Sequence, residues 1–94
     1  MDKLNLEKDK KLLVETFKKS MRDLFNFLDD LLTEEEILDL AQRVKIAQQI
    51  LGGKTYDEIA ESVGTSTATV SKIGQVLKYG RGGLAKVFLK KKSK

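Results

Sequence analysis

The chain has 94 residues, of which 40% are hydrophobic and 34% charged, with a formal net charge of +4. This composition is typical of a small globular protein, and we expect one domain over residues 1–94. Cysteine and histidine are both absent, which excludes disulfides and Cys- or His-based metal sites and removes the usual general base. No apolar run approaches the ~20 residues that a membrane span needs, and no signal peptide is visible. We therefore expect a cytoplasmic protein with no cofactor, no metal and no membrane attachment.

Positive charge is concentrated in the second half of the chain. Residues 1–52 hold nine Lys or Arg against eleven Asp or Glu, whereas residues 53–94 hold nine against three. A basic half is typical of a surface that binds a polyanion. A solvated surface with a basic tail gives the same count, so charge alone does not separate the two interpretations.

The N-terminal part of the chain is predicted to be helical and strongly apolar. Hydrophobic side chains recur there at spacings of three or four, at Leu13, Phe17, Met21, Leu24 and Leu28. We expect two helices with a break at residues 19–23. Because a chain this short cannot cover such a surface alone, we expect residues 12–53 to form a homodimer interface.

A further helix is predicted between Thr33 and the Gly52-Gly53 pair. Thr33 and Glu36 match a capping box, and three consecutive glutamates complement the positive end of the helix dipole, so no metal site is needed to explain them. The predicted buried stripe of this helix consists of Ile37, Leu40, Ala41, Val44, Ala47 or Gln48, and Leu51.

Residues 55–79 have the pattern of a helix-turn-helix. Thr55 and Glu58 match a capping box, Gly64 suits a turn that needs positive φ, and Ser66 can cap the second helix. The predicted inward positions are Ile59, Ala60, Val63, Val70, Ile73 and Leu77. A helical hairpin that binds nothing is the simpler alternative.

The outward face of the second helix is small and polar, as a surface that approaches base edges in the major groove requires. It carries Ala68, Ser71, Lys72, Gln75 and Tyr79. After a glycine-rich hinge, residues 84–94 are predicted to form a short C-terminal helix and a basic tail.

In this order, the helices resemble those of the tryptophan repressor superfamily. The resemblance is carried by LTEEEILDLAQRVKIAQQIL at residues 32–51 and by VGTSTATVSK at residues 63–72. It implies an all-α subunit of about six helices in an intertwined homodimer. Two recognition helices would then enter successive major grooves of a palindromic operator, with half-sites about 34–36 Å apart.

The resemblance also marks a ligand pocket, in which this chain departs from the family. Arg43 and Thr33 match residues that hold the indole ring of tryptophan. Lys72 replaces a stacking arginine, and Ile73 replaces a glycine that makes room for the ligand. The remaining departures are Val76, in place of a serine, and Asp30, in place of an apolar residue. We therefore expect DNA binding without tryptophan, with a different small ligand beside Arg43 as the alternative.

The expected function is that of a sequence-specific transcriptional regulator that binds double-stranded DNA and acts as a repressor. The residues predicted to contact DNA are Lys54, Ser66, Thr67, Ala68, Ser71, Lys72, Gln75, Lys78 and Arg81. A helical protein-interaction module is the alternative from another class. An enzyme is not expected, because helix starts and exposed faces account for the carboxylates.

Overall fold

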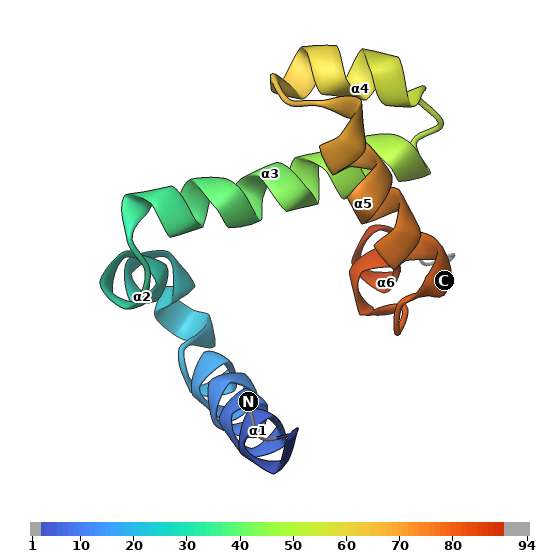
Figure 1. The fold of residues 1–94 in the computed structure, drawn as a ribbon. Helices are drawn as coiled ribbons and strands as arrows, with labels where there is room; N and C mark the ends of the chain where they lie inside the picture. Colours follow the sequence, from blue (N-terminus) through green and yellow to red (C-terminus); the bar gives the residue numbers. More distant parts are fainter. Residues whose placement is uncertain (1–2, 90–94) are drawn as a thin grey trace, which may run out of the picture. The chain divides into compact units, whose positions relative to one another are not determined.

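The fold was analysed in a computed structural model that describes residues 3–89 (Figure 1). Within this part of the chain all regular structure is helical, which confirms the predicted all-α class. The elements are α1 (Lys3–Lys19), the 3-10 turn η1 (Met21–Asp23), α2 (Leu24–Leu31), α3 (Glu34–Leu51), α4 (Tyr56–Val63), α5 (Thr67–Tyr79) and α6 (Gly83–Phe88). The predicted basic tail at residues 90–94 lies outside the described residues.

The chain divides into two compact units, Met1–Ile37 and Leu38–Lys94. We call them the N-terminal unit and the C-terminal unit, and α3 runs from one into the other. The prediction of a single domain over the whole chain stays a prediction.

In the N-terminal unit, α1 ends where the break was predicted. The Ser20 N–H donates to the carbonyls of Thr16 and Phe17 at 3.1 and 3.0 Å, and the Ser20 hydroxyl donates to the Phe17 carbonyl at 2.8 Å. These bonds replace the helical continuation and turn the chain into η1 and α2. The prediction of two helices separated at residues 19–23 is confirmed.

The N-terminal unit packs loosely. Phe17 of α1 and Phe27 of α2 meet edge to face, with ring centroids 5.2 Å apart and planes at 82°, a favourable aromatic geometry. Yet none of its described side chains is buried. Phe25 is 84% exposed and Met21 66% exposed, so the unit leaves much of its apolar surface open in the protomer.

Helix α3 begins as predicted, but its fully buried residues include only one member of the predicted stripe, Ala47. The Thr33 N–H donates to Glu36 Oε1 at 2.9 Å, and the Glu36 N–H donates to Thr33 Oγ1 at 3.1 Å, which confirms the capping box. Ile46 and Ala47 are fully buried. The predicted stripe was wrong for Leu40, Val44 and Leu51, which stay exposed, because α3 has a second apolar side that faces the core of the C-terminal unit.

That core lies where the C-terminal part of α3 meets α4 and α5 (Figure 1). Its buried members are Ile46, Ala47, Ile59, Ala60, Val70 and Ile73, with Ile50, Val63, Leu77, Leu84 and Phe88 packed against them. Every inward position predicted for the helix-turn-helix is among these residues. The short helix α6 closes the cluster through its Leu84 and Phe88 side chains.

Candidate nucleic-acid interface

The first helix of the motif, α4, is fixed at both ends by local hydrogen bonds. Thr55 and Glu58 cap its start reciprocally, at 3.0 and 3.1 Å. At its end Gly64 adopts φ 82° and ψ 42°, the left-handed region that glycine enters without steric cost. The N–H groups of Gly64 and Thr65 both donate to the Ala60 carbonyl at 2.9 Å. These caps determine where the chain turns towards α5.

The second helix, α5, begins at a capped serine. Ser66 Oγ accepts from the Thr69 N–H at 3.2 Å, and the two hydroxyl groups lie 3.1 Å apart. The Ser66 side chain thus satisfies a backbone donor in the first turn. Part of its hydrogen-bonding capacity is used inside the protein, so its predicted contact with DNA would depend on the remainder.

The two faces of α5 differ sharply. Val70, Ile73 and Gly74 are buried, which anchors the helix on the core. Among the residues predicted to read bases, Ser71 is half-buried, and the exposed ones are Ser66, Thr67, Ala68, Lys72 and Gln75. The arrangement presents an accessible polar ridge on an anchored helix, as a major-groove reader requires.

Several further cations of the C-terminal unit are exposed. The predicted phosphate-binding residues Lys54, Lys78 and Arg81 are all exposed, and long cationic side chains of this kind bind the DNA backbone. The structure adds Lys86, an exposed lysine of α6 that was not predicted. Its position two residues after Leu84, on the opposite side of an amphipathic turn, is the signal that could have identified it.

A hollow of about 360 Å3 lies beside α5. It is lined by Asp39, Gln42 and Arg43 of α3 and by Thr69, Lys72, Ile73 and Val76 of α5. The lining therefore combines two cations, one carboxylate, two neutral polar side chains and two apolar side chains. The hollow lies within the C-terminal unit, so its shape follows from the packing of α3 against α5.

The hollow brings together four of the six residues predicted for an altered ligand pocket: Arg43, Lys72, Ile73 and Val76. Asp30 and Thr33 belong to the N-terminal unit, where Thr33 caps α3, and their part in a pocket stays a prediction. Ile73 is 9% exposed.

The sequence reasoning missed three lining residues of the hollow. They are Asp39, Gln42 and Thr69. Helical spacing gives a partial signal, since Asp39 precedes Arg43 by four residues and Gln42 by three, and Thr69 precedes Lys72 by three.

Close contact between α4 and α5 depends on a glycine. The Tyr56 hydroxyl lies against Gly74, where an added Cβ atom would overlap the hydroxyl oxygen and lie 3.0 Å from Tyr56 Cζ. Tyr56 is 37% exposed, so its ring lies at the solvent-exposed edge of the contact between α4 and α5. This contact helps to set how α5 sits on the unit.

No described helix has both the length and the apolarity to cross a membrane. No group of three or more Asp, Glu, His or Cys in the described part of the chain is arranged to hold a metal ion.

Comparison with known proteins agrees with this geometry. The family model described as "Trp repressor protein" matches residues 10–92. A protein of Bacillus subtilis (strain 168) titled "Uncharacterized protein YerC" is 42% identical over 62 residues, which cover 66% of this chain and 60% of the relative. The chain thus spans about 60% of the length of that relative. No solved structure gave a significant match.

Proposed function

Because this chain belongs to the Trp repressor family, we propose that it is a homodimeric regulator of transcription that binds a specific double-stranded DNA operator. The observation that carries the proposal is the anchored helix α5. Its buried face holds Val70 and Ile73 in the core, while its opposite face offers Lys72 and Gln75 to solvent. Lys pairs well with guanine and Gln with adenine in the major groove.

The supply of charge supports the same proposal. Lys54, Lys78 and Arg81 of the same unit are exposed, and each phosphate neutralised by such a side chain releases counterions. Binding is therefore expected to weaken steeply with salt. Repression follows from occupancy of an operator that overlaps a promoter, and this is the regulatory mode that we propose.

Selection of bound duplexes from a random pool tests the proposal directly. We expect a recurrent, roughly palindromic sequence with half-sites about 34–36 Å apart. Lys78→Ala should weaken binding to the selected duplex and to random duplexes alike. The slope of the logarithm of the binding constant against the logarithm of the salt concentration should become about 1 unit shallower per lost contact. Lys72→Ala should in addition relax the preference at one position by about 1–3 kcal/mol.

A helical protein-interaction module predicts a different result. Such a module would show no enrichment of any duplex and no salt-dependent binding to DNA. Equal losses on selected and random DNA for both lysine variants would refute the assignment of Lys72 to base reading while leaving a general DNA-binding role.

The dimer is the second part of the proposal. It is supported by the exposed apolar side chains of the N-terminal unit, among them Leu12, Leu13, Phe25 and Leu31, and by Leu38 of α3, which is also exposed. Apolar surface of this extent is characteristic of interaction sites. Sedimentation at micromolar concentration should give twice the protomer mass of 10.6 kDa, and a folded monomer would refute the intertwined dimer.

Binding to DNA without tryptophan is the third part. Ile73 points into the core beside the hollow, and Val76 offers no polar partner to an ammonium group that binding would desolvate. Titration of the operator with and without millimolar tryptophan should give the same affinity. A gain of tenfold or more, which corresponds to ~1.4 kcal/mol of coupling, would contradict this part.

The hollow favours one alternative mode of control, by a different small ligand. Its wall combines Arg43 and Lys72 with Asp39, a charge pattern that suits a small amphoteric or anionic molecule. Thermal shift of the protein against a panel of amino acids and carboxylic acids tests this alternative. A ligand that raises the melting temperature of the normal protein and not of Arg43→Ala would support it.

A further inference from the structure

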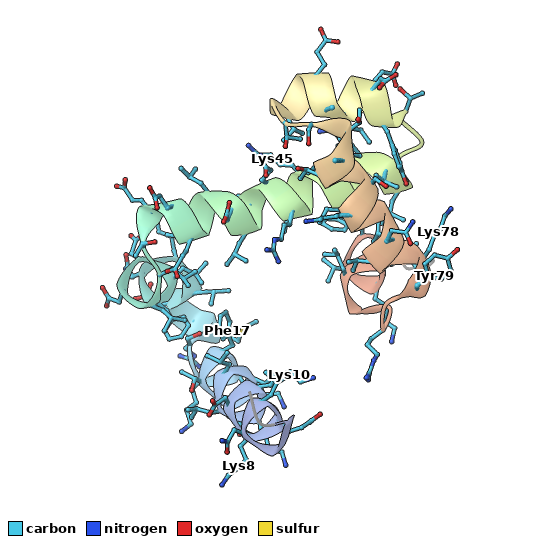
Figure 2. All side chains as sticks on the ribbon, in the orientation of Figure 1. Lys8, Lys10, Phe17, Lys45, Lys78 and Tyr79 are labelled. Atoms are coloured by element: carbon cyan, nitrogen blue, oxygen red, sulfur yellow. The ribbon has the colours of Figure 1, made fainter. Side chains whose placement is uncertain are left out.

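Tyr79 has no evident role in the fold. It is the last residue of α5 and is 76% exposed, more than any other large hydrophobic side chain described in the C-terminal unit. In Figure 2 its ring and the Lys78 side chain both project away from the ribbon at this end of the helix. A tyrosine that contributes so little to the core is available for another molecule.

The ring lies on the same side of α5 as the polar ridge. At about 100° per residue, Tyr79 comes within roughly 20° of Ala68 and Lys72 and roughly 40° of Gln75 around the helix axis. The buried Val70 and Ile73 lie on the other side. Tyr79 therefore continues the ridge that is proposed to face DNA.

Its position along the helix places it at the edge of a major groove. With a rise of 1.5 Å per residue, Tyr79 lies about 6 Å beyond Gln75 and about 16 Å beyond Ala68. The groove is only about 12 Å wide. If Ala68 and Gln75 lie between the two backbones, Tyr79 has passed the bases and reaches the level of the phosphates.

The surrounding charge suits a phosphate at that level. Lys78 precedes Tyr79 and Arg81 follows two residues later, and both are exposed. A phenolic O–H is a hydrogen-bond donor, and bonds to an ionised acceptor are stronger than neutral ones. The tyrosine side chain also loses little conformational freedom on binding, because it has only two rotatable bonds.

We propose that the Tyr79 hydroxyl donates a hydrogen bond to a phosphate oxygen at the edge of the operator half-site and so fixes how far α5 enters the groove. This inference depends on the proposed DNA-binding function and adds to it a positioning contact without charge. Tyr79 would set register on the duplex and would not read a base.

The first test is removal of the hydroxyl alone. Tyr79→Phe should weaken operator binding by about ten- to hundredfold per half-site, the usual effect of one lost hydrogen bond to a charged group. The logarithmic salt slope should stay unchanged, because a neutral donor releases no counterion, whereas Lys78→Ala should make the slope shallower. Wild-type binding with an unaffected Tyr79→Phe variant would overturn this inference and leave the proposed function intact.

The second test locates the phosphate. A set of operator duplexes, each with a single methylphosphonate at a different position, should identify one position in each half-site where the modification weakens binding of the wild type. At that position the same modification should not weaken binding of Tyr79→Phe any further. The matched control is Tyr56→Phe, which removes the same atom from a ring that faces Gly74 and should show no such coupling. Independent losses at every position would overturn the contact, as would an effect of Tyr79→Ala with none of Tyr79→Phe.

Failure of the proposed function would look different. If the wild-type protein binds no duplex from the selection at any salt concentration, the DNA-binding role itself is wrong. The inference about Tyr79 would then be overturned together with its premise.

Discussion

The two units of this protomer differ in where their apolar side chains go. In the C-terminal unit six residues from three helices form a buried core. In the N-terminal unit no described side chain is buried, although its helices are rich in Leu and Phe. Both units have well-capped or cleanly broken helices, so local structure does not explain the contrast. The difference lies in packing partners.

This contrast separates two uses of hydrophobic sequence. The core around Ile46, Ile59 and Val70 needs only its own chain, and it positions the ridge of α5 as a consequence. The exposed face around Phe25 and Met21 adds little to the stability of a single chain, because apolar surface stabilises a protein only when it is removed from water. A second copy of the chain that covers this face would make folding and dimerisation one process.

The largest expected effect comes from a charge placed in the N-terminal unit. Phe17→Asp removes the ring that meets Phe27 at 5.2 Å and buries a carboxylate in any interface built there, which is very costly. We expect loss of the dimer together with loss of cooperative folding, measured by sedimentation and by the unfolding transition in circular dichroism. The same result is expected for Leu24→Asp.

The matched control is Lys10→Asp, on the exposed polar part of α1. It introduces the same carboxylate and should leave both mass and melting largely unchanged, since surface substitutions usually change stability by no more than ~0.5 kcal/mol. A Phe17→Asp protein that stays dimeric and folded would remove the contrast between the units.

A smaller effect is expected from a cavity in the C-terminal unit. Ile59 is fully buried, and Ile→Ala at such a site costs about 2–5 kcal/mol through lost transfer energy and an unfilled space. Chemical denaturation of Ile59→Ala measures this cost. Val87→Ala, an exposed apolar position of the same unit, should cost less than about 0.5 kcal/mol. Similar costs at the two positions would show that the assigned core is not the stabilising one.

Much of this architecture could be predicted from the sequence, because it is encoded locally. A threonine with a glutamate three residues later marks the starts of α3 and α4, and Gly64 marks the turn between α4 and α5. Each signal acts within one helical turn, and each one agrees with the hydrogen bonds observed.

The face of α3 could not be predicted, for a physical reason. Its apolar residues occupy two sides, one with Ile46 and Ile50 and another with Leu40 and Val44. Helical periodicity identifies both sides but not which one packs within the protomer. The hollow was missed in part for a related reason. Helical spacing places Asp39 one turn from Arg43 and Thr69 one turn from Lys72, but it does not show that α3 and α5 enclose a hollow between them.

The two capping boxes allow a matched comparison of the two units, in which the expected change in the free energy of unfolding is about 1 kcal/mol. Thr33 and Thr55 each accept from the N–H three residues on at 3.1 Å. Thr33→Ala and Thr55→Ala should therefore cost about the same, ~1 kcal/mol, because removal of a cap is a local loss. Thr33→Ser and Thr55→Ser keep the hydroxyl and should restore most of the stability. Unequal costs in the alanine pair would indicate that tertiary packing, and not the cap, holds one of the helix starts.

The smallest effect is expected at Gly74, inside the core-facing side of α5. Alanine there gains up to about 1 kcal/mol of helix propensity, but its Cβ would overlap the Tyr56 hydroxyl oxygen and lie 3.0 Å from Tyr56 Cζ. Since Tyr56 is already 37% exposed, its ring can rotate into solvent, and we expect Gly74→Ala to change the free energy of unfolding by less than about 1 kcal/mol. In a Tyr56→Ala background, where the clash is absent, the same substitution should stabilise the protein by nearly its full propensity gain. A cost above ~2 kcal/mol for Gly74→Ala alone would mean that the Tyr56 ring cannot move aside. The α4–α5 contact would then be as rigid as the buried core, and Tyr56 would belong to that core.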